Sequence, residues 1–65
     1  MFKEDDVVRC VVHRPYYRVG DEYRVYDLHR GNIRVKDIDG DVESFTPNSF
    51  SEYFVLASRV LIGGE

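Results

Sequence analysis

The residues of this 65-residue chain that could do chemistry are few and scattered. There are two histidines, His13 and His29, one cysteine, Cys10, and a group of serines that gathers late in the chain. Nucleophilic and general acid–base catalysis need several such groups converging on one reacting atom. The sequence shows no such set and no glycine-rich loop of the kind that cradles a phosphate. It therefore predicts a protein that is not an enzyme and that uses no cofactor.

Cys10 stands in an apolar run in which Val8, Cys10 and Val12 alternate with other residues, so a strand would turn all three to one face. A thiol in such a place is usually a small buried hydrophobe. A lone cysteine forms no internal disulfide, and it fits a reducing compartment. No apolar stretch approaches the roughly 18 residues needed to cross a bilayer, and the N-terminus lacks a signal-peptide pattern. We therefore expect a cytoplasmic protein without a membrane contact.

Acidic residues at every second position surround a glycine in the segment from Asp37 to Glu43, which loosely resembles a calcium loop. An EF-hand also needs a later bidentate glutamate and flanking helices, and both are missing here. The pattern favours a solvated hairpin whose Asp39-Gly40 turn is of type I′, because that turn needs positive φ at both central residues. We expect no metal site, and a cation held by these carboxylates is the alternative.

Cations interleave with two tyrosines between His13 and Arg18, and this is the most informative stretch for binding. Arginines bind phosphates and aromatic rings stack on unpaired bases, while both residue types also serve protein interfaces. A structural interpretation competes with binding: one tyrosine closes an end of the fold and the arginines pair with Asp21, Glu22 and Asp27. The predicted partner-binding surface consists of His13, Arg14, Tyr16, Tyr17 and Arg18, with Tyr26 and Tyr53 at its rim.

The elements that must position these residues are short runs of β-branched and aromatic residues, separated by Gly, Asn, Asp and Pro. Helical periodicity is hard to find, so strands are expected at residues 7–13, 23–28, 33–38, 42–45 and 53–58. Tyr23 and Val25 would share one face of the second strand, with Tyr26 and Leu28 on the other, which indicates a bulge or a strongly curved strand. The segment from Thr46 to Phe50 cannot continue a ladder and predicts one helical turn of 3₁₀ type.

Five strands with a long connector after the first and a helical turn before the last have the order of an SH3-like barrel. Further residues carry a closer resemblance: Val8 and Cys10; Gly20, Tyr23 and Val25; Ile33, Val35, Asp39 and Gly40; Phe45, Pro47 and Phe50. Over residues 3–58 the chain resembles small uncharacterised SH3-like proteins encoded by tailed phages and bacteria. The resemblance implies an all-β fold, a small five-stranded SH3-like barrel over residues 1–58, followed by an apolar extension and frayed tail at 59–65.

In SH3 domains the first connector supplies aromatic residues to a groove for proline-rich peptides. The missing catalytic set and the aromatic, arginine-bearing connector predict a non-catalytic protein-binding module. The resemblance implies a phage or bacterial accessory protein, and we expect it to contact a larger host or self-encoded protein. The net charge of −3 favours a protein over nucleic acid, because twelve carboxylates dilute the nine lysines and arginines. The alternatives are an SH3-like domain that binds single-stranded DNA or RNA and a structural subunit that self-associates through Val60, Leu61 and Ile62.

Overall fold

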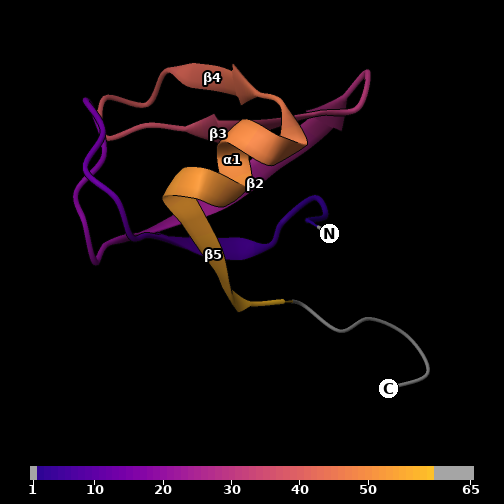
Figure 1. Cartoon of the computed structure of the whole chain (residues 1–65). Helices are drawn as coiled ribbons and strands as arrows, with labels where there is room; N and C mark the ends of the chain where they lie inside the picture. Colours follow the sequence, from indigo (N-terminus) through magenta and orange to yellow (C-terminus); the bar gives the residue numbers. More distant parts are fainter. Residues whose placement is uncertain (1, 60–65) are drawn as a thin grey trace.

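The computed structural model describes residues 2–59, which form one antiparallel sheet and one short helix. The elements are β1 (Val7–Cys10), β2 (Glu22–His29), β3 (Asn32–Lys36), β4 (Val42–Phe45), α1 (Pro47–Tyr53) and β5 (Phe54–Ser58). The strands lie in the order β4-β3-β2-β1-β5, and α1 leads from one edge strand to the other (Figure 1). The expected all-β class with five strands is confirmed. Over the described residues the sheet is open, with β4 and β5 at its edges.

β1 ends earlier than the expected strand, because the chain leaves the sheet after Cys10. Cys10 is buried, as the alternation predicted, but Val12 is exposed. The backbone of Cys10 holds both ends of the following loop: its N–H donates to the carbonyl of Asp21 at 3.1 Å, and its carbonyl accepts from the N–H of Gly20 at 2.8 Å. Residues 11–20 therefore form a connector between β1 and β2, and backbone hydrogen bonds hold its two ends together.

A bulge in β2 changes the direction of the side chains at its centre, as the large residues on both faces predicted. Val25 pairs with Val35, but the next pair along the ladder joins Asp27 to Arg34. Two residues of β2, Tyr26 and Asp27, therefore occupy the space opposite one residue of β3. The bulge places Arg34 beside both of them: it donates twice to the Asp27 carboxylate at 2.6 Å, and its guanidinium lies 5.6 Å from the centre of the Tyr26 ring.

The expectation that Leu28 shares the face of Tyr26 is wrong. Leu28 pairs with Ile33, and directly opposed residues of an antiparallel pair project to the same face. Leu28 therefore lies on the inner side, with the buried Ile33, because the extra residue of the bulge reverses the alternation. There it lines an apolar groove of about 450 Å³ together with Phe2 and Pro47.

The type I′ turn of this protein joins β2 to β3. Arg30 and Gly31 have φ values of 54° and 82°, and they connect the paired residues His29 and Asn32. Positive φ at both central residues is what a type I′ turn requires. The sequence correctly predicted a hairpin connection at residues 29–32, but not its type, because the arginine at the first central position has no special tolerance for positive φ.

The predicted type I′ turn at Asp39-Gly40 is wrong, since only Gly40 of that pair has a positive φ, of 86°. The loop is longer than a two-residue turn because Asp37 organises it. The Asp37 carboxylate accepts from the N–H groups of Asp39 and Asp41 at 2.9 and 3.0 Å, and its carbonyl accepts from the N–H of Gly40 at 3.0 Å. An aspartate that bonds the backbone two residues ahead is a local alternative to a tight hairpin.

The helical segment before β5 is an α-helix of seven residues, not the single 3₁₀ turn expected at Thr46 to Phe50. Thr46 caps it, because its side chain accepts from the N–H of Ser49 at 3.3 Å, and Pro47 fits the first turn, where its missing N–H has no intrahelical partner. The second turn forms because Phe50 is drawn into the core and the N–H of Phe54 donates to its carbonyl. Burial of one ring thus extends a segment that local sequence would leave short.

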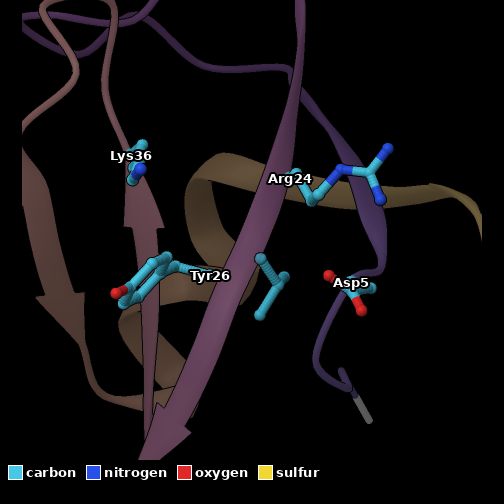
Figure 2. A pocket seen from close by; sticks show the side chains of 5 residues that line it. Asp5, Arg24, Tyr26 and Lys36 are labelled. Carbon is cyan, nitrogen blue, oxygen red and sulfur yellow. The ribbon is translucent and has the colours of Figure 1, made fainter.

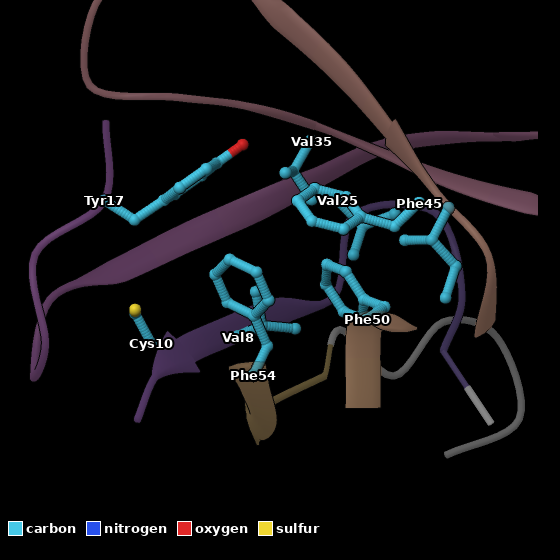
Figure 3. Packing of buried hydrophobic residues seen from close by; sticks show 9 residues of the cluster. Val8, Cys10, Tyr17, Val25, Val35, Phe45, Phe50 and Phe54 are labelled. Atoms are coloured by element: carbon cyan, nitrogen blue, oxygen red, sulfur yellow. The ribbon is translucent and has the colours of Figure 1, made fainter. Parts of the chain in front are cut away.

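Buried side chains from all five strands, α1 and the connector form one core (Figure 3). Its members are Val8, Cys10, Tyr17, Val25, Ile33, Val35, Phe45, Phe50 and Phe54. The rings of Phe50 and Phe54 stack with centres 4.5 Å apart, and Tyr17 meets Phe54 edge-on with centres 5.2 Å apart. Aromatic pairs in these arrangements add stability beyond their buried area. Tyr17 therefore closes the end of the core that faces the connector.

An ion pair with a buried carboxylate joins the segment before β1 to the segment after β5. Asp6, which precedes β1, is 1% exposed, and Arg59, which follows β5, donates to its two carboxylate oxygens at 2.9 Å each. These bonds lower the pKa of Asp6, so the carboxylate stays charged. The expected self-association segment, Val60 to Ile62, lies outside the described residues.

Candidate functional site

The connector presents a turn in which a tyrosine occupies a position that favours glycine. The N–H of Tyr17 donates to the carbonyl of Arg14 at 3.1 Å, which closes a four-residue turn around Pro15 and Tyr16. Proline at the second position and a positive φ at the third, 70° for Tyr16, are the features of a type II turn. A bulky residue with positive φ costs about 1–3 kcal/mol. The Tyr16 side chain is nevertheless 62% exposed, so core packing does not account for its place.

The residues on either side of Tyr16 anchor this turn in the fold. Arg14 forms an ion pair with Glu43 of β4, and its guanidinium lies over the rings of Phe45 and Tyr53, 4.7 and 4.8 Å from their centres. The Tyr17 hydroxyl donates to the other carboxylate oxygen of Glu43 at 3.0 Å. One carboxylate thus holds both ends of the turn.

Arg14 and Tyr17 both keep their protons near neutral pH. Burial, reinforced by Glu43, raises the pKa of the Tyr17 phenol, so the hydroxyl keeps the proton that it donates. The hydrogen bond to Glu43 likewise raises the pKa of Arg14.

A backbone hydrogen bond also holds the turn from the chain just after β3, where the N–H of Ile38 donates to the carbonyl of Tyr16 at 3.0 Å. The backbone at Tyr16 is therefore held in place by contacts with Glu43 on one side and Ile38 on the other.

The structure divides the seven predicted binding residues into three groups. Arg14, Tyr17 and Tyr53 belong to the anchor: Tyr17 is buried, and Tyr53 is half-buried against the Arg14 guanidinium. The side chains of His13, Tyr16 and Arg18 are exposed, and within residues 2–59 none of them forms an ion pair. Tyr26 lies on the outer face of the sheet, away from the inner core that Tyr17 closes.

The arginine pairing that competed with binding at the sequence level is present in part. Arg9 donates to Glu22 at 2.7 Å and Arg34 pairs with Asp27, but Arg14 pairs with Glu43. Glu43 is 29 positions away in the sequence. No local pattern links two residues at that separation, which is why sequence reasoning missed Glu43.

Apolar side chains that sequence reasoning did not include add to the exposed part of the connector, Val12, Val19 and Ile38 among them. Val12, Val19 and Ile38 are all exposed, the first two on the connector and the third bonded to it through Tyr16. We call Val12, Val19 and Ile38, with His13, Tyr16 and Arg18, the connector surface.

The Pro15-Tyr16 pair was the feature of the sequence that could have indicated the turn at Tyr16, because proline favours the second position of a turn and so places Tyr16 at the third. No feature of the sequence placed Ile38 on this surface, since the pattern predicts a strand there.

A second surface lies on the outer face of the sheet, where Asp5, Arg24, Val25, Tyr26 and Lys36 line a groove of about 300 Å³ (Figure 2). Arg24 and Tyr26 extend from β2 toward opposite sides in this view, the first toward Asp5 and the second toward Lys36. The ammonium of Lys36 lies 5.2 Å from the centre of the Tyr26 ring. Arg24 and Lys36 form no ion pair with any residue between 2 and 59.

The groups that could do catalytic chemistry stay apart in the part of the chain that the structure describes. Cys10 is buried, its Sγ donates to the carbonyl of Val12 at 3.2 Å, and burial raises its pKa, which keeps it a thiol. His13 and His29 are exposed. No three His, Cys, Asp or Glu side chains within residues 2–59 are placed to hold a metal ion. In the same range no helix has the length and apolar character to cross a membrane.

Comparisons of the chain with protein-family models, with curated proteins and with solved structures find no match.

Proposed function

We propose that this chain is a non-catalytic protein-binding module of SH3-like type that holds its partner on the connector surface. The order of the strands, the long connector after β1 and the helix before β5 support the SH3-like assignment. A phage or bacterial accessory protein that acts in the cytoplasm fits the resemblance of residues 3–58. The partner is a larger protein of the host or of the same genome.

The exposed and strained Tyr16 is the observation that carries this proposal. A glycine in its place would satisfy the turn without strain, so the tyrosine lowers stability and adds no buried contact to the core. Strained residues of this kind concentrate at functional sites, where the surrounding structure holds them in place. Tyrosine is also among the residues that dominate binding energy at protein interfaces. Tyr16 is therefore the proposed anchor of the interface.

The other residues of the connector surface favour a protein over a nucleic acid as its partner. Val12, Val19 and Ile38 add exposed apolar area, and Arg18 and His13 add polar groups, which matches the apolar centre and polar rim of protein interfaces. Glu43 neutralises Arg14, so Arg18 is the one arginine of the connector without an ion pair in residues 2–59. Because the turn is already held in place by these contacts, less conformational entropy is lost when a partner binds to it.

The test compares Tyr16→Gly with the wild type and with Tyr26→Ala, which removes an exposed tyrosine from the outer face. Each protein is immobilised, exposed to a bacterial lysate, and the captured proteins are quantified by mass spectrometry. We expect a partner that the wild type and Tyr26→Ala retain equally and that Tyr16→Gly loses by about tenfold or more, as for an interface hot spot. The purified partner should then show the same order of affinities by calorimetry. Capture that does not depend on Tyr16 overturns the proposal.

A further inference from the structure

We infer that the groove on the outer face of the sheet is a second binding site, in which Arg24, Tyr26 and Lys36 hold a short segment of single-stranded nucleic acid. This inference is independent of the connector surface, because it uses other residues on another part of the fold. Arg24 and Lys36 would each contact a backbone phosphate. Tyr26 would offer its ring to one base.

Cations without carboxylate partners are the first observation behind this inference. Arg9, Arg14, Arg34 and Arg59 are all paired with carboxylates. Arg24 and Lys36 are not paired within residues 2–59, although this chain has more carboxylates than cations. Both line the same groove. Two unpaired cations that line one groove from opposite sides can each attract an anionic group of the same extended ligand.

The second observation is that Tyr26, which follows the inward-facing Val25 and lies beside the bulge in β2, projects to the outer face of the sheet. Tyr26 is 47% exposed, and the cations of Arg34 and Lys36 lie 5.6 and 5.2 Å from its ring centre. The groove therefore combines an aromatic ring with cations, as sites for single strands do.

This combination favours a nucleic-acid strand over an acidic peptide. Both ligands bring anions to Arg24 and Lys36, but only the nucleic acid also brings flat bases for the half-exposed ring of Tyr26. A duplex fits less well, because its bases are stacked inside and its backbone would meet only the cations. The predicted ligand is a few nucleotides of unpaired DNA or RNA.

Asp5 provides a test by gain of affinity. Its carboxylate lines the groove next to Arg24, and no hydrogen bond of that side chain is found within residues 2–59 (Figure 2). A negative charge there opposes a phosphate, so Asp5→Asn should tighten binding. Asparagine tolerates the positive φ of 69° at this position as well as aspartate does. A tighter complex cannot result from misfolding.

The main experiment measures fluorescence anisotropy of short labelled oligothymidylate and oligouridylate with the whole chain at low salt. The wild type should bind, and the logarithm of its association constant should fall with the logarithm of salt with a slope of about −1.4 for two phosphates of a single strand. Arg24→Gln/Lys36→Gln should weaken binding by about tenfold or more, and Tyr26→Ala by about fivefold or more. Circular dichroism confirms that each variant is folded.

The control is Lys3→Gln/Arg30→Gln, which removes two exposed cations that do not line this groove. It changes net charge by the same amount and should leave binding within about twofold of the wild type. Equal losses in the two double variants would show diffuse attraction and overturn the site. Absence of binding by the wild type, or equal binding of an oligoglutamate peptide, would also overturn it. Tyr16→Gly should leave nucleic-acid binding unchanged, which keeps this test separate from that of the connector surface.

Amide chemical shifts of the wild-type chain provide a check that needs no variant. Titration with the unlabelled oligonucleotide should move the signals of Arg24, Tyr26 and Lys36 most. Movement centred on the connector surface instead would contradict the proposed location.

Discussion

Arg59 donates two hydrogen bonds of 2.9 Å to the buried carboxylate of Asp6, across 53 positions of the sequence. The pair joins the chain before β1 to the chain after β5, and the N–H of Lys3 adds a bond of 2.7 Å to the same carboxylate. Protonation of this carboxylate removes the charge that Arg59 pairs with, so the contact contributes to how the fold responds to acid.

Stability should fall with acid in a way that depends on Asp6. The hydrogen bonds from Arg59 hold the pKa of Asp6 below its ordinary value of 3.8. The ion pair therefore contributes fully above about pH 5 and is lost as the pH falls through the lowered folded-state pKa. Asp6→Asn should lower the free energy of unfolding at neutral pH by about 1.5–3 kcal/mol and flatten its dependence on acid pH. Urea denaturation between neutral and acid pH measures both effects.

Asp27→Asn is the matched control for that prediction, because Asp27 is also paired with an arginine but is more exposed. Its loss of stability should be smaller than that of Asp6→Asn. Equal losses would mean that burial of the Asp6 pair has no special weight.

Two substitutions of Tyr16 should separate the strain of its backbone from the role of its ring. Tyr16→Gly removes both, while Tyr16→Ala removes the ring and keeps a Cβ at a positive φ of 70°. We expect Tyr16→Gly to be more stable than Tyr16→Ala by about 1 kcal/mol, because glycine has no steric penalty there. Chemical denaturation measures the difference. Both variants should lose the partner, and a partner kept by either one would remove Tyr16 from the interface.

Loss of the Glu43 carboxylate should loosen the whole turn. Glu43→Gln removes the charge that pairs with Arg14 while keeping an oxygen for the Tyr17 hydroxyl. We expect a loss of about 1.5–3 kcal/mol in the free energy of unfolding. Glu52→Gln, an exposed residue of α1, is the control and should stay within about 0.5 kcal/mol of the wild type. A thermal or urea melt that treats the two alike would contradict the anchoring role of Glu43.

The Cys10 thiol should be protected in the folded protein. It is buried, and burial raises its pKa, so few thiolates are present and none is accessible. A thiol reagent should modify it only as fast as the chain unfolds. Cys10→Ala should cost about 1 kcal/mol of stability and leave partner binding intact. Fast modification of the native protein, or loss of the partner in Cys10→Ala, would reopen a role for this thiol in function.

Local features of the chain were predictable wherever neighbours in sequence decide the structure. The bounds of β4 were predicted correctly from a four-residue run between a turn and a proline segment. The burial of Cys10 followed from its alternation with Val8. The bulge in β2 followed from large residues on both faces, although its effect on Leu28 did not. Strand alternation and the residue preferences of turns depend on residues that are close in sequence, so both can be predicted from the sequence alone.

The sequence by itself determined an all-β chain with a tyrosine- and arginine-rich connector, because strand periodicity and residue type are local properties. Only the tertiary structure decided which of two adjacent tyrosines enters the core. Tyr17 goes inward because its ring meets Phe54 and its hydroxyl reaches Glu43, and Tyr16 is left exposed at a positive φ. Those contacts join residues far apart in sequence, and packing, which no local pattern encodes, distinguishes between neighbours of the same type.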